Sequence, residues 1–156
     1  MIRLIDTGLL DTVSQAAAAS PRRRRNHNFH ADDSYPAHRL LNALEPGTYI
    51  APHRHLDAGK DETLILLRGR IGLVIFDEQG AVTTTALLED GGASRGVDIP
   101  HGTWHTLVTL ASGSVFFEAK AGPYTALAPA ERAPWAPVEG DAAAVTYLAA
   151  LLKRFY

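Results

Sequence analysis

Between residues 39 and 120 the hydrophobic residues occur in short runs separated by turns rich in glycine, proline and aspartate. The runs are rich in branched and aromatic residues, and they cover 39–44, 48–55, 63–67, 71–76, 82–88, 96–99, 104–110 and 114–120. Runs of this length and composition are typical of β-strands. Many short strands joined by regular turns predict an all-β fold, here a double-sheet jelly roll.

A different hydrophobic period marks the N-terminal segment. Residues 8–19 carry apolar side chains at helical spacing, namely Leu9, Leu10, Val13, Ala16 and Ala17. Thr7 or Asp6 can cap the start of this helix, and Pro21 ends it. The pattern predicts a short amphipathic helix packed on a larger body.

The C-terminal segment repeats this pattern after a loop broken by Pro129, Pro134 and Pro137. Residues 141–153 predict a second helix, with apolar residues three and four apart at Val145, Leu148, Leu152 and Phe155. Asp141 is a suitable N-cap, and Lys153 and Arg154 complement the negative end of the helix dipole. This helix packs on the barrel or on a partner subunit, so a homodimer is one expected assembly.

Composition narrows the classes of function. The chain has 156 residues, 46% hydrophobic and 21% charged, which is ordinary for one globular domain with a single core. A net charge of −2 argues against a general nucleic-acid or membrane-surface binder. With no cysteine, a bound metal must be held by nitrogen and oxygen, and no oxidising compartment is required.

The N-terminal segment is not a signal peptide by pattern. Asp6 and Asp11 interrupt the apolar stretch before the alanine run, and no run of transmembrane length occurs. We therefore expect a cytoplasmic protein.

Four consecutive arginines, residues 22–25, follow the first helix. Such a run is most often a solvated, salt-bridging surface. The alternative is anion recognition, because guanidinium groups bind phosphate or carboxylate in a bidentate manner, as a nucleotide-sugar ligand would require.

Three histidines and a carboxylate predict a metal site. On an extended strand His53 and His55 point to the same side, because side chains two apart share a face. Glu62 opens the next apolar run, and His105 supplies a third imidazole. Asp57 is the alternative carboxylate. Such a donor set suits a divalent iron, manganese, nickel, copper or zinc ion and leaves coordination positions free for water or substrate.

The spacing of these residues resembles the two sequence motifs of the cupin superfamily. The first motif is matched by Gly47, the His-x-His pair, Glu62 and Gly69, and the second by Pro100-x-Gly102-x-x-His105. Three departures are present. The gap of residues 56–61 before the glutamate is longer than usual, Ser94 replaces the glycine that begins the second motif, and Thr109 replaces the usual asparagine.

A narrower resemblance is to the WbuC-type cupin-fold metalloproteins associated with O-antigen and surface-polysaccharide gene clusters. It is carried by residues 25–30, 39–44, 49–55, 118–124 and 133–137. The resemblance implies a single cupin domain over residues 1–156, with an N-terminal helix and arm (1–38), a barrel (39–120) and a C-terminal loop and helix (121–156). It also implies a role in lipopolysaccharide biosynthesis. It brings no settled reaction, since a shared barrel hosts many chemistries.

Further polar residues are candidates for binding and catalysis. Glu118 and Lys120 lie two apart on the last predicted strand and share a face, either as a structural ion pair or as ligand-binding groups. Tyr124 can line the rim of the pocket as a donor or acid, or can serve packing. Candidate ligand-binding residues are Arg25, Asn42 and Arg54. Trp104, next to His105, is expected to pack, and no metal role is assigned to His27, His30, His38 or His101.

These residues leave three functions open. The first is a small metalloenzyme, an isomerase, epimerase, hydrolase or oxygenase, that acts on a carbohydrate or nucleotide-sugar while Glu118, Lys120 or Tyr124 moves a proton. The second is a non-catalytic module that binds a metal or a sugar. The third is a metal-independent epimerase with a histidine base and a tyrosine acid, which the paired His53 and His55 disfavour.

Overall fold

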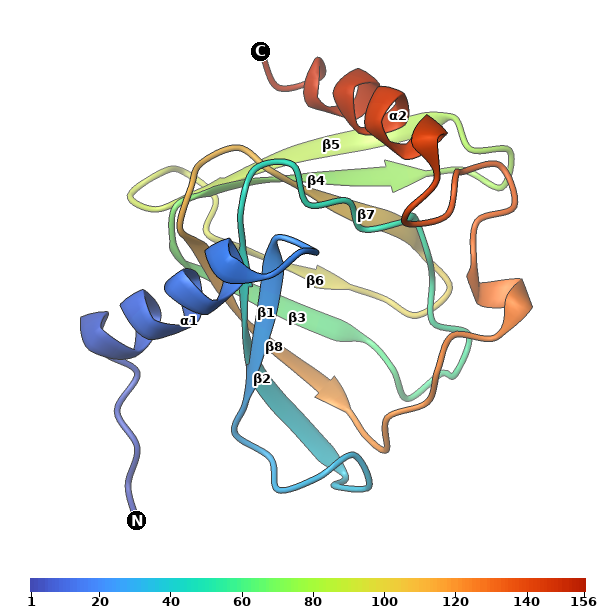
Figure 1. The fold of residues 1–156 in the computed structure, drawn as a ribbon. Helices are drawn as coiled ribbons and strands as arrows, with labels where there is room; N and C mark the ends of the chain where they lie inside the picture. The colour runs from blue at the N-terminus through green and yellow to red at the C-terminus, as the bar shows by residue number, and fades with distance from the viewer.

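A computed structural model describes residues 1–156 and contains two helices and eight strands (Figure 1). The helices are α1 (Thr7–Ala19) and α2 (Ala142–Leu152), with a short 3-10 helix at Pro129–Glu131. The strands are β1 (Arg24–Asn28), β2 (Ala37–Leu44), β3 (Glu62–Arg68), β4 (Arg70–Phe76), β5 (Val82–Glu89), β6 (Gly96–Ile99), β7 (Trp104–Thr109) and β8 (Ser114–Ala121).

Two antiparallel sheets form the barrel. The larger has five strands in the order β1-β2-β8-β3-β6, and the smaller has three in the order β5-β4-β7. Alternate residues of β3 are buried, as expected for a strand with one face on the core. Leu64 and Leu66 from this face meet Ile71 and Leu73 of β4 in the main core cluster. The predicted all-β jelly roll with terminal helices is confirmed.

Helix α1 covers the outer face of the larger sheet. The Asp6 side chain accepts a hydrogen bond from the Leu9 N–H, as predicted for its cap. Val13 and Ala17 pack on Leu41 and Ala43 of β2. This helix therefore fixes which face of β2 points away from the barrel interior.

Helix α2 covers the smaller sheet, so it packs on the barrel of its own chain (Figure 1). Its buried residues are Ala144, Leu148 and Leu151. Val145 was predicted on this face but is 74% exposed, because the buried stripe is shifted by one position. Asp141 stands at the N-cap position without a side-chain capping bond, contrary to prediction. Neither α1, with 13 residues, nor α2, with 11, has the length and apolarity that a membrane-spanning helix needs.

Two segments differ from the sequence prediction. Residues 48–55 form no strand of either sheet; Pro52 lacks an N–H donor, and the chain makes only isolated bridges at His53. Residues 24–28, where no strand was predicted, form β1 at the edge of the larger sheet. This strand adds a wall to the barrel interior.

Candidate functional site

A backbone bridge brings the two histidine motifs together. The His53 N–H donates to the His105 carbonyl over 3.1 Å, and the His105 N–H donates to the His53 carbonyl over 3.0 Å. Gly102 allows the turn before His105, since its φ of +78° lies in the left-handed region. The ring centroids of His53 and His105 are 4.6 Å apart, and those of His53 and His55 are 5.4 Å apart.

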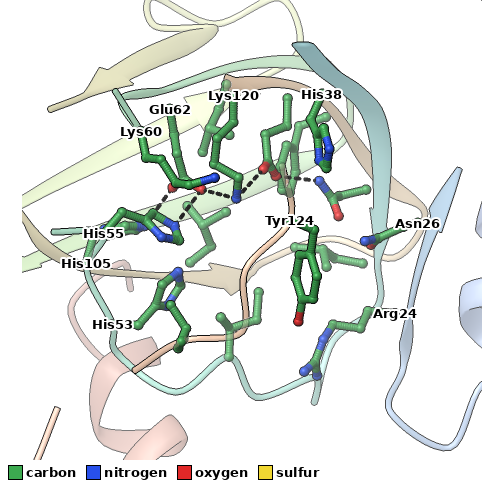
Figure 2. Close-up of a pocket in the computed structure, with 18 of the residues that line it drawn as sticks. Arg24, Asn26, His38, His53, His55, Lys60, Glu62, His105, Lys120 and Tyr124 are labelled. Atoms are coloured by element: carbon green, nitrogen blue, oxygen red, sulfur yellow. Dashed lines mark hydrogen bonds and ion pairs between the residues drawn. The ribbon is translucent and has the colours of Figure 1, made fainter. Parts of the chain in front are cut away.

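Glu62 lies between these imidazoles at the start of β3 (Figure 2). It is only 5% exposed. One carboxylate oxygen, Oε1, is 3.0 Å from His55 Nε2, and the other, Oε2, is 3.1 Å from His105 Nε2. One ligand atom each from His53, His55 and Glu62 lie within 4.8 Å of one another. The structure thus gathers all four predicted ligands in one place.

The alternative carboxylate lies elsewhere. Asp57 is exposed, and its Oδ1 accepts the Gly59 N–H over 2.8 Å in the turn between His55 and Glu62. The longer gap is taken up by this turn, which returns the chain to β3. Glu62 is therefore the carboxylate beside the imidazoles.

The hydrogen bonds of two rings favour a cation at this place. His53 Nδ1 lies 3.0 Å from the Ala51 carbonyl, and His105 Nδ1 lies 2.9 Å from the Thr103 carbonyl. Because a carbonyl oxygen only accepts, each ring carries its proton on Nδ1 and directs the lone pair of Nε2 inward when neutral. His105 Nε2 then faces the Glu62 carboxylate, acceptor against acceptor. A metal ion bound by both groups resolves that conflict, so the residues present fit a divalent ion.

Burial sets the ionisation of the group. It lowers the pKa of His53 to about 3, with the neighbouring His105 acting in the same direction, so the ring is neutral as a ligand must be. Burial alone would raise the pKa of Glu62. The adjacent His105 and His55 rings and the charge of Lys120 outweigh burial and hold that pKa below its usual range.

The four residues line one end of a pocket of about 650 Å³ (Figure 2). Its floor is apolar and is formed by Leu44, Ile50, Leu64, Leu107 and Phe116. Its other walls are polar and come from β1, β2, β8 and the loop after β8. Pockets with an apolar floor and a few convergent polar groups are typical of small-molecule sites.

Lys120 joins the carboxylates of this pocket. Its Nζ lies 2.6 Å from Glu62 Oε1 and 3.0 Å from Glu118 Oε1. Asn42 Nδ2 donates to the other oxygen of Glu118 over 2.8 Å. Burial would lower the pKa of Lys120, but Glu118 and Glu62 outweigh it and raise that pKa above its usual value. The predicted shared face of Glu118 and Lys120 is thus both an ion pair and a pocket wall.

Tyr124 lines the pocket from the loop after β8. It is 63% exposed, and its N–H donates to the Asp33 carbonyl over 2.7 Å. Of the two predicted roles, the structure has Tyr124 at the rim rather than in the packed interior (Figure 2).

Two predicted ligand-binding arginines point away from the pocket. Arg54 pairs with Glu78 over 2.8 Å and stacks 4.1 Å from the centroid of the Trp104 ring, outside the pocket lining. Arg25 borders the pocket, but it pairs in register with Ala43, which is buried beneath α1. Strand alternation therefore turns the Arg25 side chain outward, and Arg24 is the arginine that faces inward.

Sequence reasoning assigned no individual role to several polar lining residues, among them Arg24, Asn26, His38 and Lys60. Once β1 is known, alternation places Arg24 and Asn26 on one face, but the charged composition of this segment hid the strand. The salt-bridging interpretation of the arginine run holds for Arg22 and Arg24, which both bind Glu139 with a closest distance of 2.7 Å.

One family model matches the sequence. The family model described as "Domain of unknown function (DUF6016)" matches residues 5–88, more than half of the chain. No curated protein matches the sequence.

Solved structures are similar over most of the chain. The conserved SPY1581 protein of unknown function from Streptococcus pyogenes has a TM-score of 0.55 at 13% identity, covering 80% of this chain and 91% of that one. KdgF from a Halomonas species has 0.50 at 15%, covering 67% and 83%. A cupin-2 domain protein from Shewanella frigidimarina has 0.47 at 16%, covering 62% and 79%. At such identities the similarity to the first two is one of fold, the cupin jelly roll.

Proposed function

The protein belongs to the DUF6016 family and has the cupin fold, and on that premise we propose that it is a divalent-metal-binding enzyme for a small polar ligand. His53, His55, Glu62 and His105 are the proposed metal ligands. The observation that carries this proposal is their convergence, from a segment before β3, from β3 itself and from β7, on one end of a pocket.

The set of donor atoms limits which metal ions can bind. Three imidazoles and one carboxylate, with no cysteine in the chain, suit iron, manganese, zinc or nickel. When bound, such an ion supplies Lewis-acid polarisation of an oxygen ligand. The chain fixes the rings of His53 and His105 through carbonyls at Nδ1.

The proposed proton-transfer groups are Lys120, Glu118 and Tyr124. Lys120 donates to Glu118 within the pocket, and Tyr124 carries its hydroxyl on a loop at the rim. A carboxylate and an ammonium in contact, both largely withdrawn from solvent, can hold and move a proton toward a bound ligand.

The proposed substrate class is a carbohydrate or nucleotide-sugar of surface-polysaccharide metabolism. What supports it is the polar character of the pocket walls, together with the WbuC-type resemblance of residues 49–55 and 118–124. The narrower family and the polysaccharide pathway stay predictions.

One observation favours the metal-free alternative. Lys120 lies 2.6 Å from Glu62 and already balances its charge, so the site is a complete acid–base group without an ion. In that case His105, Lys120 and Tyr124 would exchange protons with a sugar directly.

Metal content separates these functions. We expect protein purified without chelator to hold about one divalent ion per chain by elemental analysis, and His105→Ala to lose it. The matched control is His101→Ala, because His101 stands four residues away, is exposed and bonds Asp61 instead. Equal metal content in the two variants would contradict the proposed ligand set.

Turnover separates enzyme from binding module. The protein is incubated with a panel of nucleotide-sugars with and without chelator. Turnover abolished by chelator supports the metalloenzyme. Bound metal without turnover indicates the binding module, and turnover that resists chelator indicates the metal-free epimerase.

A further inference from the structure

A second cavity of about 390 Å³ adjoins the pocket. It lies over the inner face of β1 and β2 and shares Asn26, His38, Glu118, Lys120 and Tyr124 with the pocket that holds the proposed metal ligands. The two spaces are therefore neighbours across the Lys120 side chain. Its own residues include His30 and Asn28, which none of the chemistry above uses.

The sheet register gives the distance between Glu62, at the proposed metal site, and His38, at the second cavity. Lys120 of β8 pairs with Glu62 of β3 on one side and with His38 of β2 on the other. The three residues thus form one row across the sheet, and their side chains share the inner face. Two strand spacings separate Glu62 from His38, which is about 10 Å.

His30 and His38 are stacked at the far end of this row. Their ring centroids are 3.9 Å apart with an interplanar angle of 12°. Each residue is only 7% exposed. The polar edges of two buried rings are thus presented side by side to the cavity.

Each ring has one nitrogen without a protein partner. His30 Nδ1 lies 3.1 Å from both the N–H and the carbonyl oxygen of Arg39, so Nε2 is the ring nitrogen that contacts no protein group. His38 donates from Nε2 to the Asp33 carbonyl over 3.2 Å, which leaves the Nδ1 lone pair free. These two ring nitrogens are therefore free to exchange hydrogen bonds with a ligand in the second cavity.

Two asparagines extend this polar surface. Asn26 and Asn28 lie two apart on β1 and face inward, opposite Asn42 and Leu40 in register. Neither amide hydrogen-bonds another protein group, and both line the second cavity. Amides and imidazoles each offer donors and acceptors together, as hydroxyl groups do.

The charges here favour an uncharged ligand group. Lys120 is the one cation of the second cavity, and both Glu62 and Glu118 already bind it. Asp33 and Glu118 are the acidic residues of its lining. A phosphate or carboxylate would find no free cation, whereas a hydroxyl group would find donors and acceptors.

We propose that His30, His38, Asn26 and Asn28 form a second ligand subsite that binds the hydroxyl groups of a neutral polyol, the sugar-like end of a molecule whose other end reaches the metal site. The second half of this proposal rests on the proposed function. The subsite itself does not, because none of its residues is a metal ligand.

The test uses the chelator-treated full chain labelled with ¹⁵N-histidine. Methyl galactoside, methyl glucoside and myo-inositol are titrated while the ring nitrogens of His30 and His38 are followed by NMR. We expect a saturable shift of His30 Nε2 and His38 Nδ1 with at least one of the three. Asn28→Ala and Asn26→Ala each weaken that binding about two- to ten-fold, the effect of one hydrogen bond.

His27→Ala is the matched control. His27 lies on β1 between the two asparagines, faces the other side of the sheet and contacts Phe29, so its loss leaves the polyol affinity unchanged. Asn26 and Asn28 lie at an exposed edge, so their truncation preserves the fold.

The outcomes separate the two proposals. Absence of a saturable shift with all three polyols overturns the subsite, as does equal weakening by His27→Ala. A shift that requires added metal overturns the subsite and leaves the metal site standing. A shift in the chelator-treated chain, together with no uptake of a divalent ion when one is added back, supports the subsite and refutes the proposed metal function.

Discussion

Lys120 is the residue on which the charge balance of the pocket depends. It forms ion pairs with both Glu62 and Glu118, and all three side chains are largely withdrawn from solvent. An ion at Glu62 would have to share that carboxylate with the ammonium group. Removing the lysine charge should therefore act in opposite directions on the metal-free and the metal-bound protein.

We expect Lys120→Met to destabilise the metal-free protein and to tighten metal binding. Two partly unpaired buried carboxylates are left behind, a situation that costs up to about 3 to 5 kcal/mol when a buried pair is broken. A divalent ion relieves the same repulsion. Urea denaturation with and without metal measures both effects, with Lys153→Met, at the exposed end of α2, as control. Equal loss of stability with and without metal would contradict this role.

Single residues differ in how far the sequence predicts them. Glu62 follows from motif spacing, and Glu118 and Lys120 from their separation by two on a strand. Arg25 was chosen over Arg24 because the choice depends on which residues start the strand, and a shift of one position turns every side chain to the other face. Arg54 lies between two metal-site histidines, yet it stacks on Trp104 on the opposite side of the chain.

At the scale of elements, β1 is held by a pair of salt bridges that the sequence pattern did not predict. We call these contacts of Arg22 and Arg24 with Glu139 the tether. Arg22 and Arg24, at the start of this strand, both bind Glu139 from the loop before α2. The contact joins residues more than a hundred positions apart. Pattern analysis finds helices and paired strands because their periods are local, whereas a contact of this kind depends on the completed fold.

This tether should make part of the stability sensitive to acid. Hydrogen bonds from Arg22 lower the pKa of Glu139 to about 2, against the opposing effect of burial and with help from Arg24. Because the folded pKa lies below the unfolded value of 4.5, its stabilisation is full above about pH 5 and is lost as the pH falls toward 2. The contribution is modest, since the carboxylate is about one-third exposed.

Urea denaturation across this pH range measures the effect. We expect the stability difference between the wild type and Glu139→Gln to shrink as the pH falls, because the glutamine variant has no charge to lose. A difference that stays constant from neutral to acid pH would show that the arginines gain nothing from the carboxylate charge.

The segment 48–55 also differs between the sequence prediction and the structure. Its alternating residues predicted a strand, and the two histidines do point into one space, but the chain is bridged to β7 only at His53. Local sequence therefore predicted the direction of the side chains correctly and the sheet pairing wrongly. Pro52 is the physical reason, because it removes a donor where a ladder would need one.

At the scale of the whole molecule, the proposed metal site ties distant parts of the barrel together. Its ligands come from the segment before β3, from β3 in the larger sheet and from β7 in the smaller one. An ion bound there would connect the two sheets. The jelly roll could be predicted from strand pattern, but the joining of its sheets at one end could not.

We therefore expect metal to raise the melting temperature of the wild type. An ion at a hundred times its Kd adds about 2.7 kcal/mol. For a chain of this size that is roughly 5 to 10 °C. Thermal unfolding monitored by circular dichroism, before and after chelation, measures it. His53→Ala should melt at the same temperature in both conditions, and a metal-dependent rise in that variant would place the ion elsewhere.

A continuous line of contacts runs from Asn42 through Glu118 and Lys120 to Glu62 and so joins the pocket to the second cavity. Anything that draws Lys120 toward one carboxylate loosens its hold on the other. We therefore expect occupancy at one end to alter affinity at the other, and thermodynamic linkage requires the factor to be equal in both directions.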